Sequence, residues 1–185
     1  MPLQAAKILD EYLGAAARAG DKAAFGKLAA RWQSKLMAHA YRLLGDIESA
    51  RDVVQDGWSD IVKNLKRLDD TAAFPAWAYR IISRRAADNI RKKQRTRKIN
   101  QAYAAEPRES NSAEYPIDID ADSSPLRRAI AGLPSKQRAA IALFYLEEFS
   151  VAETAVALSV PAGTVKTRLM KARQSLRAIL EGENP

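Results

Sequence analysis

The chain has 185 residues, of which 47% are hydrophobic, and a formal net charge of +8. This length suits one medium domain or two small ones, and the absence of cysteine excludes disulfide bonds and thiolate metal sites. No apolar run is long enough to span a membrane, and the N-terminus lacks the pattern of a signal peptide, so we expect a cytoplasmic protein with no stable membrane insertion. The positive charge favours an anionic partner.

The N-terminal part, residues 1–98, is predicted to form a helical bundle. Helical propensity indicates helices over residues 3–19 and 21–44, the second capped by Asp21. The only histidine, His39, lies near the apolar stripe of the second helix. A lone histidine with no cysteine or second histidine is typical of packing rather than metal binding.

The third helix, which begins after its cap at Asp46, is predicted to have two different faces. Apolar residues recur at helical spacing and indicate a buried stripe of Val54, Trp58, Ile61, Leu65 and Leu68. Three carboxylates spaced four apart lie on a wetter face: Asp52, Asp56 and Asp60. These could be metal ligands of a nuclease, but no partner converges on them from another element. We therefore expect no catalytic residue, no metal site and no cofactor.

The next segment changes from aromatic to strongly basic. Its inward residues are predicted to be Phe74, Trp77, Ala78, Ile81 and Ile82. Another face carries Arg80, Arg84, Arg91 and Arg95, interrupted by Asp88, and more basic residues crowd the end of the helix. Charges this dense repel one another, which favours a polyanion as the partner, although a merely solvated helix face is the alternative interpretation.

The runs DVVQDGW and FPAWAYRIISRRAADNIRKKQR resemble the second conserved region of bacterial sigma factors of the extracytoplasmic-function (ECF) class in the sigma-70 family. The resemblance implies that the third helix docks on the β′ clamp of core RNA polymerase. It also implies that the basic helix and the loop before it bind the promoter −10 element. The implied polymerase-binding residues are Asp52, Gln55 and Asp56. The implied −10 residues are Asp69, Asp70, Thr71, Arg80, Arg84, Asp88, Arg91 and Lys92.

Residues 99–124 are predicted to form a flexible acidic linker. The segment has no sustained periodicity, two prolines, and six acidic residues against one arginine. An ordinary tether is one interpretation, since linkers are often acidic for solubility. The resemblance implies the other, in which the linker threads through the polymerase along part of the path later taken by RNA.

The C-terminal part, residues 125–185, is predicted to be a helix-turn-helix domain. Ser150 and Glu153 have the spacing of a capping box, and the turn SVPAG places Pro161 at the start of a new helix. Apolar residues expected in this core include Leu146 before the motif and Ile179 in its second helix. Two helices joined by a short turn, the second lined with basic residues, are typical of DNA binding.

The stretch GTVKTRLMKAR resembles the helix of the fourth sigma region that reads the promoter −35 element. The implied −35 residues are Thr164, Lys166, Thr167, Arg168, Lys171 and Arg173. By matched position, Lys166, Thr167 and Lys171 are expected to meet base edges, whereas Arg168 and Arg173 are expected to bind the phosphate backbone. A purely structural basic helix is the alternative.

The sequence therefore predicts an all-α protein of two small helical domains, sigma region 2 and sigma region 4, joined by the linker. The resemblance implies an alternative sigma factor, not an enzyme, that directs promoter-specific transcription initiation. Its implied partners are core RNA polymerase, through the β′ clamp and the β flap, promoter DNA, and an anti-sigma factor. The rival interpretations are a stand-alone helix-turn-helix regulator, and a sigma-like mimic that binds an anti-sigma factor instead of DNA.

Overall fold

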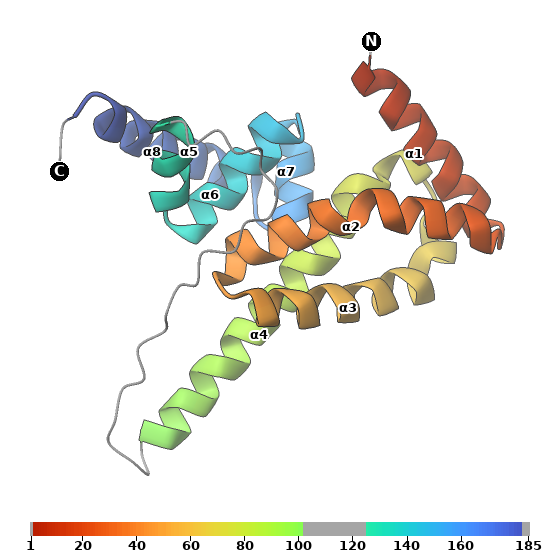
Figure 1. Cartoon of the computed structure of the whole chain (residues 1–185), viewed down its shortest axis with the longest axis horizontal. Helices are drawn as coiled ribbons and strands as arrows, with labels where there is room; N and C mark the ends of the chain where they lie inside the picture. The colour runs from red at the N-terminus through yellow and green to blue at the C-terminus, as the bar shows by residue number, and fades with distance from the viewer. Residues whose placement is uncertain (1, 102–124, 183–185) are drawn as a thin grey trace.

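A computed structural model describes residues 2–101 and 125–182 of the chain (Figure 1). Within these residues the secondary structure is helical and includes no β-strand, which confirms the predicted all-α class. The predicted linker lies outside the described residues, apart from its first three positions. These three extend the last helix of the N-terminal group, which continues to Gln101.

The N-terminal group begins with two helices that pack against each other and continues into a third and a long fourth helix. Two short 3₁₀ turns connect the third and fourth helices. The elements are α1 (Pro2–Arg18), α2 (Lys22–Leu44), α3 (Ile47–Asn64), η1 (Leu65–Arg67), η2 (Thr71–Ala73) and α4 (Phe74–Gln101).

The C-terminal group consists of four helices and one π-helical segment, η3, that directly follows α6. Helices α7 and α8 form the predicted helix-turn-helix. The elements are α5 (Pro125–Gly132), α6 (Ser135–Ile141), η3 (Ala142–Leu146), α7 (Val151–Leu158) and α8 (Ala162–Leu180).

The predicted helix caps are present, which explains why the helices begin where they do. Asp21 and Asp46 each accept backbone N–H groups in the first turns of α2 and α3. Gly45 ends α2 with a φ of 70°, a left-handed conformation that glycine adopts without strain. Ser150 and Glu153 form the reciprocal capping box at the start of α7.

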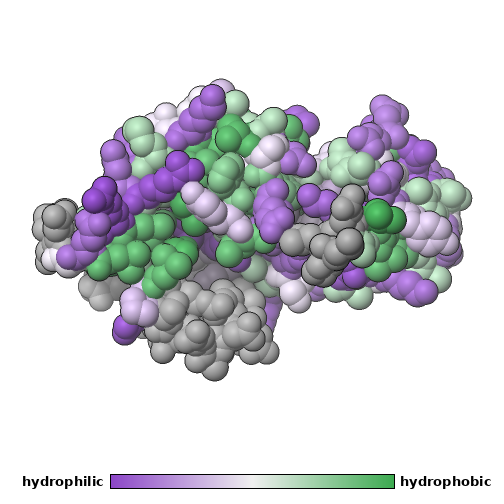
Figure 2. All heavy atoms as spheres, turned by 90° about the horizontal axis from the view of Figure 1, so that it is seen from above, coloured by the Kyte–Doolittle hydropathy of each residue, from purple (hydrophilic) through white to green (hydrophobic). Residues whose placement is uncertain are grey.

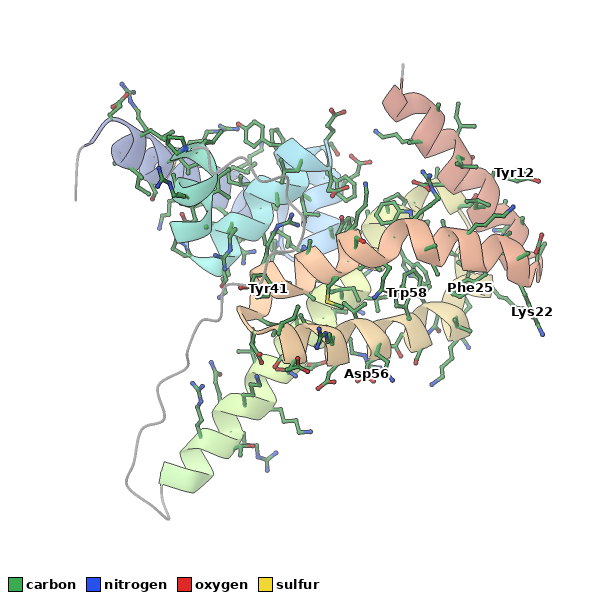
Figure 3. All side chains as sticks on the ribbon, viewed as in Figure 1. Tyr12, Lys22, Phe25, Tyr41, Asp56 and Trp58 are labelled. Carbon is green, nitrogen blue, oxygen red and sulfur yellow. The ribbon has the colours of Figure 1, made fainter. Side chains whose placement is uncertain are left out.

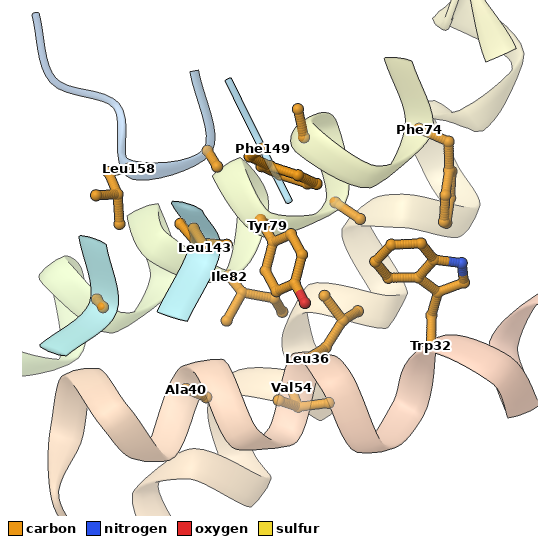
Figure 4. Close-up of a cluster of buried hydrophobic side chains, with 14 of the residues drawn as sticks. Trp32, Leu36, Ala40, Val54, Phe74, Tyr79, Ile82, Leu143, Phe149 and Leu158 are labelled. Atoms are coloured by element: carbon orange, nitrogen blue, oxygen red, sulfur yellow. The ribbon is translucent and has the colours of Figure 1, made fainter. Parts of the chain in front are cut away.

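Helix α4 lies at the centre of the fold, because it packs against α2, α3 and α7. Figure 4 shows its Tyr79 between residues of the N-terminal group, such as Leu36, and residues of the C-terminal group, such as Leu143 and Phe149. Tyr79 and Leu36 are fully buried, and Phe149 is 8% exposed. The two helical groups therefore share one continuous core in this arrangement.

Polar contacts also join the two groups. Lys35 of α2 forms an ion pair with Glu147, with 2.8 Å between Nζ and Oε2. The guanidinium group of Arg138 donates a hydrogen bond to the carbonyl oxygen of Arg42 at 3.2 Å. Nearby, the completely buried His39 ring lies 2.9 Å from the hydroxyl of Ser83, so this histidine packs in the core as predicted.

Two residues expected in the C-terminal core are exposed instead. Leu146 is 61% exposed, because it ends the π-helical segment, whose wider turn shifts the register of the residues that follow α6. Ile179 is 48% exposed and lines an open cleft beside α5, because α8 extends its stripe beyond the helices that cover its first half. The third helix also ends earlier than its apolar pattern, although Leu65 and Leu68 stay buried through the 3₁₀ turn.

Candidate polymerase and DNA interfaces

The outward face of α3 holds the three residues predicted to bind polymerase. Asp52, Gln55 and Asp56 are all exposed, because the opposite face of the helix packs into the bundle. Figure 3 shows Asp56 on the side of α3 that points away from α2. Val62 continues this face at helical spacing and is 56% exposed. A face that combines acids with an exposed apolar side chain suits a protein partner and repels DNA.

Three close contacts fix the orientation of α3. The indole N–H of Trp58 donates to Oε1 of Gln33 at 2.6 Å, and the same ring packs edge-on against Phe25 with 5.9 Å between centroids. A side chain at Gly57 would collide with Ile82 of α4, so the glycine allows α3 and α4 to approach closely. These contacts leave the acidic face of α3 outward.

A cleft of about 600 Å³ lies between α3 and α4, and it includes the −10 candidates Arg84 and Asp88. The neighbouring Arg85 forms an ion pair with Asp60 at 2.6 Å and a weaker one with Asp56 at 3.5 Å. The hydrogen bond that Arg85 donates to the carboxylate of Asp60 is the main cause of the raised pKa of Arg85. The sequence did not single out Arg85, because its partners lie 25 and 29 residues away.

The −10 candidates along α4 differ in how free they are to bind another molecule. Arg80 is half-buried, whereas Arg84, Arg91 and Lys92 are exposed. Arg91 forms an ion pair with Asp88 one turn earlier. Arg84 and Lys92 form no ion pair within the described parts of the chain, so their charges are available to an anion.

The loop before α4, which holds the remaining −10 candidates, is fixed by α1. Arg18 donates hydrogen bonds at 2.8 Å to two loop carbonyl groups, including that of Asp69. Asp70 caps the 3₁₀ turn η2 by accepting from the backbone N–H of Ala72 at 2.9 Å. The Asp69 and Asp70 side chains are exposed and Thr71 is half-buried. The support from Arg18 was not predicted, because 50 residues separate it from the loop.

The basic end of α4 is tied back to α3 by Lys93. Its ammonium group lies 3.0 Å from the carboxylate of Asp46, the residue that caps α3. Hydrogen bonds from Ser49 and then from Lys93 lower the pKa of Asp46 to about 2. Arg95 and Arg97 further along are exposed, and the structure gives them no ion pair within residues 2–101 and 125–182.

Helix α8 presents the predicted base-reading residues outward. Its inner side is fixed in the core by Val165, Leu169 and Ala172. Lys166, Thr167 and Lys171 are exposed, and Thr164 is half-buried at the start of the helix. The Thr167 hydroxyl donates to the carbonyl of Gly163 at 3.0 Å, which orients this side chain on the helix surface.

The two arginines predicted to bind phosphate have different surroundings. Arg173 is exposed and donates from Nε to the Tyr145 hydroxyl at 2.9 Å, with its guanidinium carbon 5.8 Å from the ring centroid. Arg168 is half-buried, and burial lowers its pKa. Tyr145 was not predicted to be part of this surface, because it reaches α8 from the π-helical segment.

The structure thus keeps the three candidate sets apart on α3, on α4 with its preceding loop, and on α8. No group of three histidine, cysteine, aspartate or glutamate residues in the described ranges is arranged to hold a metal ion. Within the same ranges no helix is both long and apolar enough to cross a bilayer.

Family comparisons match the two helical groups separately. The family model for sigma-70 region 2 matches residues 28–96, from α2 to the basic part of α4. The model for sigma-70 region 4 matches residues 123–176, which include the helix-turn-helix. Helix α1, which holds the loop before α4, lies outside both matches.

Similar proteins extend over most of the chain. The ECF RNA polymerase sigma factor SigW of Bacillus subtilis is 31% identical over 85% of this chain and 89% of its own length. SigM of Mycobacterium tuberculosis is 31% identical over 92% of this chain and 84% of its own length. The fold resembles the sigma factor RpoE of Bartonella quintana, solved with the anti-sigma factor NepR, with a TM-score of 0.66, 24% identity and coverage of 86% and 98% of the two chains. The chain therefore belongs to the ECF sigma factors of the sigma-70 family.

Proposed function

We propose that the protein is an alternative sigma factor that binds core RNA polymerase and directs transcription initiation at particular promoters. The observation that carries this proposal is the separation of an acidic, partly apolar face on α3 from cationic faces on α4 and α8. A DNA-binding protein that acts alone does not need the acidic face of α3. A sigma factor needs all of them, because it joins polymerase to DNA.

The work of such a protein is differential binding rather than covalent chemistry, so we propose no enzymatic activity. Polymerase alone binds DNA mainly through sequence-independent electrostatics, and the sigma factor adds affinity for promoter sequences. In this account Lys166, Thr167 and Lys171 read the −35 element in the major groove. The loop of Asp69, Asp70 and Thr71 binds an unpaired base of the −10 element.

On α4, the proposed residues of the −10 site are Arg80, Arg84, Asp88, Arg91 and Lys92. Exposed arginine and lysine side chains on one helix suit the phosphates of the opened strand. Asp88 differs from the others because its negative charge is directed to Arg91. We therefore propose that Asp88 positions Arg91 rather than contacting phosphate.

Two surfaces are proposed to bind core polymerase. The first is the α3 face of Asp52, Gln55 and Asp56, which would bind the β′ clamp. The second is an apolar patch on α5 and α8, where Ile179 and Leu180 line an open cleft and are 48% and 49% exposed. Figure 2 shows hydrophobic residues gathered toward the end of the molecule that holds these helices. An exposed apolar patch of this kind is typical of a protein contact, and it suits the β flap.

We also propose an anti-sigma factor as a regulatory partner and the cytoplasm as the site of action. The relative from Bartonella quintana, which shares this fold, was solved bound to an anti-sigma factor. Such a partner would compete with polymerase for the same exposed faces.

Binding measurements can separate this proposal from its rivals. A sigma factor binds core polymerase tightly, and its promoter selectivity appears in the assembled complex. A stand-alone regulator instead binds specific duplex DNA without polymerase and shows no affinity for the core enzyme. A mimic binds an anti-sigma factor but gives no promoter-selective complex with polymerase.

A further inference from the structure

A second basic surface adjoins the base-reading face of α8. It is a cleft of about 630 Å³ between the start of α6 and the first half of α8. Lys136 and Gln137 line it from α6, and Thr164, Arg168 and Lys171 line it from α8. The spacing of residues within α8 could not reveal Lys136, because it reaches the cleft from a different helix.

The charges in this cleft are not balanced by acids. Its lining includes three cationic residues, Lys136, Arg168 and Lys171, and no carboxylate. The cleft between α3 and α4 is different, because Asp60 and Asp88 lie among its arginines. In the part of the chain that the structure describes, no ion pair involves the three cations of the α6–α8 cleft.

The surroundings of Arg168 also indicate that no acid balances the positive charge of the cleft. Burial is the only cause of its lowered pKa, so no neighbouring carboxylate compensates for the desolvation of its guanidinium group. A half-buried cation without an acidic neighbour raises the local positive potential. An anion that entered the cleft would meet Arg168 at its wall and Lys136 at its exposed rim.

We propose that Lys136 contacts a backbone phosphate of the −35 DNA and thereby positions α8 in the major groove. The proposal rests on the −35 reading assigned to α8 above. Thr167 and Lys171 belong both to the outward face of α8 and to the lining of the cleft. DNA seated on that face therefore brings its backbone over the cleft. Lysine suits this role because it carries a compact charge on a flexible stem.

The test is promoter binding by the full chain assembled with core polymerase, over a range of salt concentrations. The probe is a promoter selected from a random library by the wild-type complex, together with the same promoter carrying a scrambled −35 element. Lys136→Ala should weaken binding to both probes by the same factor, because a phosphate contact carries no sequence information.

The salt dependence gives the second readout. Loss of one phosphate contact should lower the slope of log K against log salt by about 0.9. The advantage of the wild type over the variant should therefore shrink about 3.5-fold between 50 and 200 mM salt. Lys136→Arg should keep most of the wild-type slope, because it retains the positive charge.

Two control variants complete the design. Lys22→Ala removes an exposed lysine at the end of α2 that lies far from α8 (Figure 3), and it should change neither affinity nor slope. Lys171→Ala should instead weaken binding to the selected promoter by about 5- to 150-fold while changing binding to the scrambled one much less, because it removes a base contact.

Several results would overturn the assignment of Lys136. An unchanged slope would exclude a phosphate contact, and a loss confined to the selected promoter would indicate base reading. Tighter DNA binding by Lys136→Ala would show that Lys136 makes no favourable contact with the DNA. If the wild-type complex bound both probes equally, the −35 reading assigned to α8 would be wrong. If the wild-type complex preferred the selected promoter but Lys136→Ala bound both probes like the wild type, only the role of Lys136 would be rejected.

Discussion

The phenol ring of Tyr79 on α4 packs edge-on against the ring of Phe149, with 5.6 Å between centroids and 79° between planes. Tyr79 belongs to the segment that matches sigma region 2, and Phe149 belongs to the segment that matches region 4. The carboxylate of Glu147 faces the buried Tyr79, and burial and this negative charge together raise the pKa of the phenol. This contact links the helix that carries the −10 candidates to the domain that carries the −35 candidates.

Replacement of Phe149 by alanine should destabilise the protein. The side chain is 8% exposed, so its loss should lower the free energy of unfolding by about 3 kcal/mol through lost burial, the resulting cavity and the lost aromatic pair. Urea unfolding followed by tryptophan fluorescence would measure this change. Leu146→Ala is the matched control, because Leu146 is 61% exposed and its truncation should change stability by no more than about 0.5 kcal/mol. Equal effects of the two substitutions would contradict the shared core.

A crosslink should detect the packing of the two groups in solution. The chain has no cysteine, so Lys35→Cys combined with Glu147→Cys introduces the only two thiols. The native side chains meet at 2.8 Å, and a short bis-maleimide should therefore join the two positions within one molecule. Mass spectrometry of the digested product would identify the crosslink. The control pair, Lys22→Cys with Glu147→Cys, places one thiol at the first residue of α2, 13 residues before Lys35, and should crosslink much more slowly. Similar yields from both pairs would rule out a stable contact between the groups.

Stability should fall as the pH is lowered below about 6.5, because of His39. Burial, followed by the positive charge of Arg42, lowers the pKa of His39 from 6.5 to about 3. The unfolded chain therefore binds a proton near pH 6.5 that the folded chain does not bind until near pH 3. The free energy of unfolding should be about 2 kcal/mol lower at pH 5 than at pH 7 from this group alone.

The variant His39→Gln provides the comparison, because the chain has no other histidine. Its free energy of unfolding should be lower than that of the wild type at pH 7 but nearly constant between pH 7 and pH 5. Chemical denaturation at a series of pH values would measure both profiles. Parallel profiles for the two proteins would assign the acid sensitivity to other groups.

Reversal of one charge on α3 should weaken binding to core polymerase. Asp56→Arg places a cation in the centre of the proposed docking face and should raise the dissociation constant by about tenfold or more. The fold should persist, because Asp56 is exposed and its ion pair with Arg85 is long, at 3.5 Å. Glu11→Arg makes the same charge change on the exposed surface of α1 and should leave polymerase affinity nearly unchanged. If both variants bound core polymerase like the wild type, Asp56 would lie outside the interface.

Local features of the fold could be predicted from the sequence, whereas contacts between distant segments could not. The caps at Asp21 and Asp46 and the capping box of Ser150 and Glu153 depend on residues within one turn, so their spacing was enough to identify them. The burial of Tyr79 was missed, because α4 is packed by three other helices and has no single apolar stripe.

The same distinction holds for the candidate sites. The exposed residues Lys166 and Lys171 follow from the helical periodicity of α8, whose apolar side is fixed in the core. The contacts of Arg18 with the loop before α4 and of Arg85 with Asp60 depend on how separate helices approach one another. No pattern within one helix contains that information.

Run-off transcription from a promoter library, with core RNA polymerase alone and with core polymerase plus this protein, tests whether the protein is a sigma factor. A sigma factor predicts new transcripts that appear only with the protein and start downstream of promoters sharing a −35 and a −10 element. Asp56→Arg should reduce all of these transcripts together. An unchanged transcript set, measured with protein that binds duplex DNA tightly but does not bind core polymerase, would contradict the account and identify a stand-alone regulator.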